Sequence, residues 1–145
     1  MLALLQRVSH ARVEVAGETV GQICPGLLVL VGVQPADGPA QATRMAERLL
    51  GYRVFEDGDG RINLSLTDTG GGLLLVPQFT LAADTDRGRQ PSFTSAAEPR
   101  HAQAMFEVLV DAARQRHTDV AIGRFGADMQ VSLTNDGPVT FLLRG

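Results

Sequence analysis

The chain has 145 residues, enough to bury one hydrophobic core without disulfides or a structural metal, and we expect a single domain over residues 1–145. Hydrophobic residues make up 44% of the chain and charged residues 20%, which excludes an intrinsically disordered protein. The net charge of -3 argues against a protein that coats the phosphates of nucleic acid. We therefore expect no DNA partner, and any contact with RNA must be local.

The N-terminal apolar stretch is interrupted by Gln6, Arg7 and His10 before it reaches the length of a signal-peptide core. No other apolar run approaches membrane-spanning length, so we expect a cytoplasmic protein without a membrane partner. The single cysteine, Cys24, allows no disulfide within the chain and no zinc cage of thiolates. We expect it to be a buried, inert thiol.

Strands are predicted for the first part of the chain. Alternating apolar residues from 2 to 15 predict one strand that feeds another, and residues 16–18 form the turn of a hairpin. Residues 19–23 are the return strand, which ends at the breaker Cys-Pro-Gly of residues 24–26. The continuous apolar run of residues 27–33 is typical of a strand buried on both faces, and we expect it to be the central strand.

Two segments have the spacing of amphipathic helices, residues 39–52 and residues 98–117. The expected buried face of the first consists of Ala42, Met45, Ala46, Leu49 and Leu50, and that of the second of Ala102, Met105, Phe106, Leu109, Val110 and Ala113.

Further strands are predicted at residues 54–55 and 73–76. The acidic residues 56–60 resemble part of a calcium loop but lack its downstream glutamate, so we expect an exposed hairpin turn there. Three more strands follow at residues 120–122, 129–133 and 139–143. The order of elements predicts an α/β fold, a single three-layer domain with a mixed β-sheet, two helices on one face and an antiparallel β layer on the other.

Conventional catalytic groups are scarce. His10, His101 and His117 show no metal-ligand spacing, and the acidic residues are scattered over loops, so we expect no metal and no cofactor. If the chain is an enzyme, we expect it to work without a conventional acid-base side chain.

Gln78 and Thr80 follow the buried strand 73–76, and open sheets bind ligands at such strand ends. Backbone amides splayed there can receive a developing oxyanion. Alternatively, both polar side chains only satisfy the backbone of their own loop.

The segment 123–129 contains Phe125 and Met129 among small residues. An aromatic ring and a thioether in such a loop can stack on a nucleobase. Both side chains are equally compatible with a place in the core.

Residues 135–140, with the sequence Asn-Asp-Gly-Pro-Val-Thr, are expected to join two strands as a tight connection. A cis Gly137-Pro138 bond would present two fixed carbonyl oxygens on one side, suited to selecting a small ligand. The alternative is a plain hairpin turn with a trans proline.

Four segments together resemble the D-aminoacyl-tRNA deacylase family: residues 4–8, 78–81, 123–129 and 135–140, which read LLQRV, QFTL, GRFGADM and NDGPVT. The resemblance covers nearly the whole chain. It implies a homodimeric cytoplasmic hydrolase, active in translation proofreading, that binds the 3′ end of aminoacyl-tRNA and cleaves the ester bond of D-aminoacyl-tRNA and of mischarged glycyl-tRNA.

The resemblance also implies roles for single residues. Gly137 and Pro138, joined by a cis bond, would enter the partner subunit's pocket and exclude the side chain of an L-amino acid. The active site would thus lie at the subunit interface. The catalytic region would be Gln78, Phe79 and Thr80, and the other substrate-binding residues would be Phe125 and Met129 at the adenosine and Arg7 as a brace for the Gly-Pro loop across the dimer.

We expect water assisted by the substrate's 2′-hydroxyl, rather than Thr80, to attack the ester, because no base is available to activate a threonine. The chain has Pro77 where the family usually has serine, as in a sister branch with relaxed chiral discrimination. The rival hypothesis is a non-catalytic module that binds the tRNA 3′ end.

Overall fold

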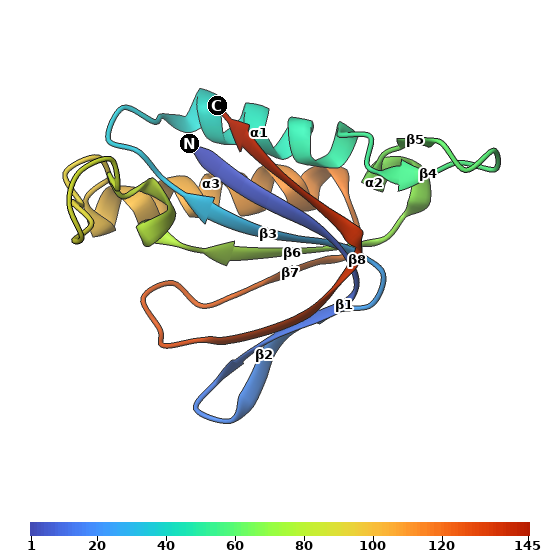
Figure 1. Cartoon of the computed structure of the whole chain (residues 1–145), viewed down its shortest axis with the longest axis horizontal. Helices are drawn as coiled ribbons and strands as arrows, with labels where there is room; N and C mark the ends of the chain where they lie inside the picture. The colour runs from blue at the N-terminus through green and yellow to red at the C-terminus, as the bar shows by residue number, and fades with distance from the viewer.

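The computed structural model describes residues 1–145 as one six-stranded sheet with flanking helices and a small separate hairpin (Figure 1). The strand order is β2-β1-β3-β6-β7, and β8 pairs with β1. In chain order the elements are β1 (Leu2–Val15), β2 (Glu18–Ile23), β3 (Gly26–Gly32), α1 (Pro39–Gly51), β4 (Phe55–Glu56), β5 (Ile62–Leu64), α2 (Leu66–Thr69), β6 (Gly72–Pro77), the 3-10 helix η1 (Phe79–Ala82), α3 (Pro99–Arg116), β7 (Val120–Ile122) and β8 (Gln130–Arg144).

The centre of the sheet is the parallel pair β3 and β6, as the continuous apolar runs predict. α1 and α3 pack side by side on one face of this pair (Figure 1). Their predicted apolar faces are buried against β3, β6 and the first half of β1, and together they form the main core. No helix of the chain has the length and apolar character that a membrane crossing requires.

The opposite face is covered by an antiparallel layer made of the second half of β1, β2 and the first half of β8 (Figure 1). A second, smaller core lies between this layer and the central strands. Its members are Val8, Ala11, Val13 and Ile23 from the layer and Leu28, Leu74 and Val76 from β3 and β6. The predicted three-layer arrangement is therefore confirmed.

Three local predictions are wrong. Residues 2–15 form one continuous strand, because this segment pairs with β8 over almost its whole length. Residues 129–133 and 139–143 also belong to one strand, β8, since both pair antiparallel with β1 and so run in the same direction. Cys24 is exposed in the turn between β2 and β3.

The acidic residues after β4 form the predicted hairpin turn. The backbone amides of Arg61 and Asp59 donate to the Asp57 carboxylate and lower its pKa. The short helix α2 is not predicted from the sequence. It is held by a reciprocal cap in which the Ser65 amide donates to Asp68, and this bond is the main cause of the lowered pKa of the Asp68 carboxyl.

Candidate functional site

The Gly137-Pro138 dipeptide lies in an excursion in the middle of β8. Asn135 pairs with Val8 and Thr140 pairs with Gln6, so residues 136–139 face a single residue of β1 and leave the regular ladder. The Gly137-Pro138 peptide bond is cis, as the resemblance implies, and both residues are exposed. The segment is therefore a projection from a long strand, and it does not connect two strands.

Arg7 braces the projection from within the same chain. Its Nε donates to the backbone oxygen of Asp136 at 3.0 Å and its Nη1 donates to the backbone oxygen of Val54 at 2.8 Å. The Arg7 side chain is only 10% exposed, and the Asp136 carboxylate lies 3.6 Å from Nε. Arg7 thus holds the projection within one chain, and a brace across a dimer stays a prediction.

Asn135 closes the base of the projection, a role that the sequence reasoning missed. Its Nδ2 donates to the backbone oxygens of Arg7 at 2.9 Å and Val139 at 3.0 Å, so one carboxamide ties β1 to the far side of the excursion. Its residue type could have indicated this role, because asparagine side chains in such segments tend to form hydrogen bonds with nearby backbone groups.

Glycine is required at position 137. Its φ of +137° is a conformation that residues with side chains rarely adopt. An added Cβ would lie 2.8 Å from Val139 Cγ2 and 3.1 Å from Arg7 Nη2. The brace and the backbone conformation thus fit only a residue without a side chain.

The second half of the candidate site lies where β6 ends. The Gln78 amide donates to the Val31 oxygen at 2.8 Å, and the chain then turns into η1. The Gln78 carboxamide contacts the exposed Thr80 hydroxyl. A carboxamide in either orientation cannot take a proton from a hydroxyl, so this contact does not activate Thr80 as a nucleophile.

Phe79 and Thr80 are the first two residues of η1, so their amides have no acceptor within that helix. No side chain caps them. The end of β6 therefore combines backbone donors, a carboxamide and a hydroxyl at one exposed point.

An apolar cavity of about 470 Å³ opens beside this point. Phe79, Phe93 and Phe125 line it together with Pro77, and the rings of Phe79 and Phe93 lie 5.4 Å apart. The sequence alone did not indicate that Phe93 lies here. Aromatic walls of this kind suit a flat ring system.

The structure separates the two residues that were expected to share an adenosine. Phe125 lines the cavity, whereas Met129 packs against the second core. The Met129 sulfur accepts a bond from the Arg124 amide at 3.4 Å, and a Cβ added to Gly123 would lie 2.9 Å from it. Met129 therefore packs within its own loop in one chain, and its contact with the ligand stays a prediction.

Within one chain the two halves of the site lie at opposite ends of the sheet (Figure 1). Arg7 pairs with Leu27, which pairs with Leu73, so the projection is level with the start of β6. Gln78 follows the end of that strand, roughly 16 Å further along at ~3.3 Å per residue. Because β1 and β3 separate β8 from β6, the halves are also roughly 14 Å apart across the strands at ~4.8 Å per strand.

The three histidines make local bonds. His101 contacts the Asp37 backbone oxygen at 2.6 Å, His117 contacts that of Gly71 at 2.6 Å, and His10 contacts the Thr134 hydroxyl at 3.0 Å. Nowhere in the chain do three potential metal-ligating side chains gather.

Comparison with known proteins finds close relatives over nearly the whole chain. The family described as D-Tyr-tRNA(Tyr) deacylase matches residues 4–144. A D-aminoacyl-tRNA deacylase from Methylococcus capsulatus is 63% identical, with 99% of this chain and 94% of the relative covered. Another, from Thioalkalivibrio sulfidiphilus, is 66% identical, with coverage of 99% and 96%.

Two solved structures share the fold. A protein described as a c-Myc DNA unwinding element binding protein superposes with a TM-score of 0.95 at 35% identity, covering 100% of this chain and 99% of that one. A probable eukaryotic D-amino acid tRNA deacylase gives a TM-score of 0.85 at 16% identity, covering 98% and 97%.

Proposed function

The chain belongs to the D-Tyr-tRNA(Tyr) deacylase family, a family of hydrolases, and from this membership we propose that it cleaves the ester between a D-amino acid and the 3′-terminal adenosine of tRNA. The products are the free D-amino acid and uncharged tRNA. Mischarged glycyl-tRNA is a second substrate. The reaction removes wrongly charged tRNA before it reaches translation.

The active site is shared between two copies of the chain in a homodimer. The observation that supports this most directly is the separation of the halves: Gly137 and Pro138 are exposed at one end of the sheet and the Gln78–Thr80 turn at the other. A two-fold axis brings the projection of each copy to the strand end of the other, so one contact surface completes two sites. Exposed apolar side chains are available for such a surface, among them Phe79, Phe141 and Leu142.

The terminal adenosine binds in the apolar cavity beside η1. Phe79, Phe93 and Phe125 offer faces for the adenine ring, and base-aromatic stacking contributes about 1–3 kcal/mol per base. The ester carbonyl then lies next to the amides of Phe79 and Thr80, which donate to the oxygen as negative charge develops. Gln78 orients the Thr80 hydroxyl at the edge of the same space.

Water is the nucleophile. Its oxygen bonds to the carbonyl carbon, the bond to the 3′ oxygen breaks, and the proton released by the water ends on the 3′ oxygen through the neighbouring 2′-hydroxyl. No side chain has to act as a base, which agrees with the absence of an acid or imidazole from the bonds around Thr80.

Chirality is selected by exclusion. The Gly137-Pro138 unit of the partner occupies the space that the side chain of an L-amino acid would need and leaves room for the α-hydrogen of a D-amino acid or glycine. The bonds from Arg7 and Asn135 to the excursion keep this unit in place. Because selection works by occupied space, it does not depend on which D-amino acid the substrate carries. Pro77 lines the cavity at the position where the family usually has serine. Its identity affects how strongly the site discriminates D- from L-amino acids.

The proposal is tested by incubating the purified chain with D-tyrosyl-tRNA and L-tyrosyl-tRNA and measuring the release of each amino acid. We expect rapid hydrolysis of the D substrate, little of the L substrate, and no inhibition by a chelator. Binding of both tRNAs without turnover would support the rival hypothesis of a non-catalytic module.

A further inference from the structure

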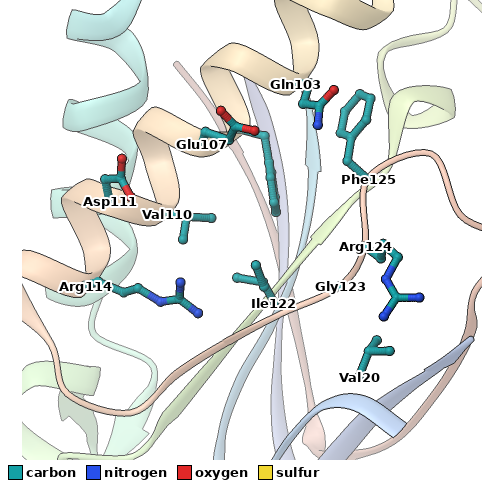
Figure 2. Close-up of a pocket in the computed structure, with 11 residues that line it drawn as sticks. Val20, Gln103, Glu107, Val110, Asp111, Arg114, Ile122, Gly123, Arg124 and Phe125 are labelled. Carbon is teal, nitrogen blue, oxygen red and sulfur yellow. The ribbon is translucent and has the colours of Figure 1, made fainter. Parts of the chain in front are cut away.

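A second cavity, of about 440 Å³, runs along α3 between this helix and the segment that follows β7 (Figure 2). Its volume lies within the ~300–1,000 Å³ of typical ligand sites. None of the catalytic residues proposed above lines it. Phe125 lines both this groove and the apolar cavity, so the two spaces adjoin at a single aromatic ring.

The groove has basic groups on both walls. Figure 2 shows Arg114 extending from α3 toward Ile122 and Arg124 extending from the opposite wall toward Val20. Neither arginine takes part in any of the ion pairs of the chain. The only side-chain bond of Arg114 is a long one, 3.5 Å, to the Val120 backbone oxygen. Both guanidinium groups therefore keep donors for a ligand.

The rest of the lining is apolar at the bottom and acidic along the helix. Val110 and Ile122 provide a surface for a ring, and Glu107 and Asp111 place carboxylates on the α3 side (Figure 2). A ligand that suits this groove must carry both an anion and a flat ring with hydrogen-bond donors. A simple anion such as a dicarboxylate would meet Glu107 and Asp111 as like charges.

We propose that this groove binds the nucleotide that precedes the terminal adenosine of the tRNA. The inference rests on the proposed function, because the adenosine is assigned to the adjoining cavity. The phosphate that links the two nucleotides lies against Arg124, next to Phe125. Because tRNA ends in CCA, the base is cytosine, whose exocyclic amino group donates to carboxylates such as Glu107.

The proposal also explains how a chain with a net charge of -3 holds RNA. The net charge disfavours binding by a general basic surface, so the arginines that contact phosphates must lie beside the reacting end. Arg114 and Arg124 meet this condition, because their groove continues the cavity that receives the reacting end.

The test compares two substrates that differ by this nucleotide. D-tyrosyl-tRNA contains it, and 3′-O-D-tyrosyl-adenosine does not. For Arg124→Gln we expect kcat/KM on D-tyrosyl-tRNA to fall by about tenfold or more, as for the loss of a charge-assisted bond. The same variant should hydrolyse 3′-O-D-tyrosyl-adenosine at the wild-type rate. Arg124→Lys should recover part of the loss, because it keeps the positive charge.

Arg44→Gln is the matched control, since Arg44 is an exposed arginine without an ion pair on the other helix, α1. It should leave both substrates unaffected. The dependence of log kcat/KM on log salt should become shallower by about 0.7 for Arg124→Gln and stay unchanged for Arg44→Gln, as the loss of one phosphate contact on a single strand requires.

Equal losses on both substrates would overturn the proposal, because Arg124 would then act on the adenosine or the reacting ester. Wild-type rates on both substrates would overturn it too, because the groove would not contribute to binding. Failure of the wild-type chain to hydrolyse either substrate would instead overturn the proposed function, and with it the occupant named here.

Discussion

At the scale of single residues, the most consequential contacts are those by which buried Arg7 and half-buried Asn135 hold a short exposed segment in place. The Arg7 guanidinium and the Asn135 carboxamide together donate to the backbone oxygens of Asp136, Val54, Arg7 and Val139. The selection that we propose works by occupying space, so the projection must not move away from the substrate. These bonds fix both ends of the projection.

Asn135→Asp tests this function of the carboxamide. The substituted side chain has nearly the same shape, but a carboxylate cannot donate to the two backbone oxygens. We expect the free energy of unfolding to fall by about 1–3 kcal/mol and the ratio of D- to L-tyrosyl-tRNA hydrolysis to fall with it. Denaturant unfolding and the two-substrate assay measure these effects.

Ser132→Ala is the control for Asn135, since Ser132 is exposed on the same strand and makes no side-chain bond. It should change neither quantity. If Asn135→Asp lowered stability but left the D-to-L ratio intact, Asn135 would support the strand without positioning the filter.

Thr80→Ala distinguishes water attack from attack by threonine. The Thr80 hydroxyl contacts only the Gln78 carboxamide, so its removal should leave activity within about tenfold of wild type. Loss of a true nucleophile costs on the order of 10⁶ in kcat. Single-turnover hydrolysis of D-tyrosyl-tRNA measures the difference, and a near-complete loss would identify Thr80 as the nucleophile.

At the scale of elements, β3 and β6 must approach closely where their parallel pairing begins. Gly26 pairs with Gly72, and a Cβ added to Gly26 would lie 1.9 Å from the Gly72 oxygen. A methyl group at this point must push the two central strands apart. Both cores contain residues of these strands, so the displacement would disturb both sides of the sheet.

Gly26→Ala and Gly51→Ala are therefore expected to have opposite effects on stability. Gly26→Ala should cost at least the ~1–3 kcal/mol of an overpacked core. Gly51 is helical, and nothing lies within 4 Å of its added Cβ, so its replacement should raise stability by up to about 1 kcal/mol. Thermal unfolding measures both, and an unchanged midpoint for Gly26→Ala would contradict the pairing of these glycines.

The sequence was sufficient to predict the elements whose burial follows from the local spacing of apolar residues. The buried faces of α1 and α3 and the central position of residues 27–33 were predicted because apolar spacing reports directly on which side faces a core. The course of β8 was not predicted. Asn-Asp-Gly reads locally as a turn, and only the long-range pairing of both halves with β1 shows that the strand continues.

The same limit applies to the candidate site. Gln78, Thr80 and Phe125 could be identified as candidates because each stands at a strand end or in a small-residue loop. Met129 has the same local signal as Phe125, yet in the fold it is partly buried against the second core. Phe93 could not be found, because its place in the cavity depends on how a loop folds back on η1.

At the scale of the whole molecule, the two segments that we propose to form one site lie at opposite ends of the sheet. The projection of β8 is well braced but has no ligand-binding cavity of suitable aromatic character beside it, and the aromatic cavity beside η1 lacks the projection. We propose that association of two copies supplies each cavity with the projection that it lacks, so that catalysis requires the homodimer.

Complementation between two defective chains tests this requirement most directly. Phe79→Pro removes an amide donor from one half, and Gln78 before it already has a non-helical backbone, with φ -142° and ψ 82°. Gly137→Val displaces the projection of the other half, because valine rarely adopts a φ of +137° and its Cβ would clash with Val139 and Arg7. Each homodimer should be inactive toward D-tyrosyl-tRNA.

The purified heterodimer, isolated with two different affinity tags, contains one doubly altered site and one intact site, and should recover about half of the wild-type activity per dimer. A heterodimer as inactive as its parents would show that each chain builds its site alone, and would contradict the account.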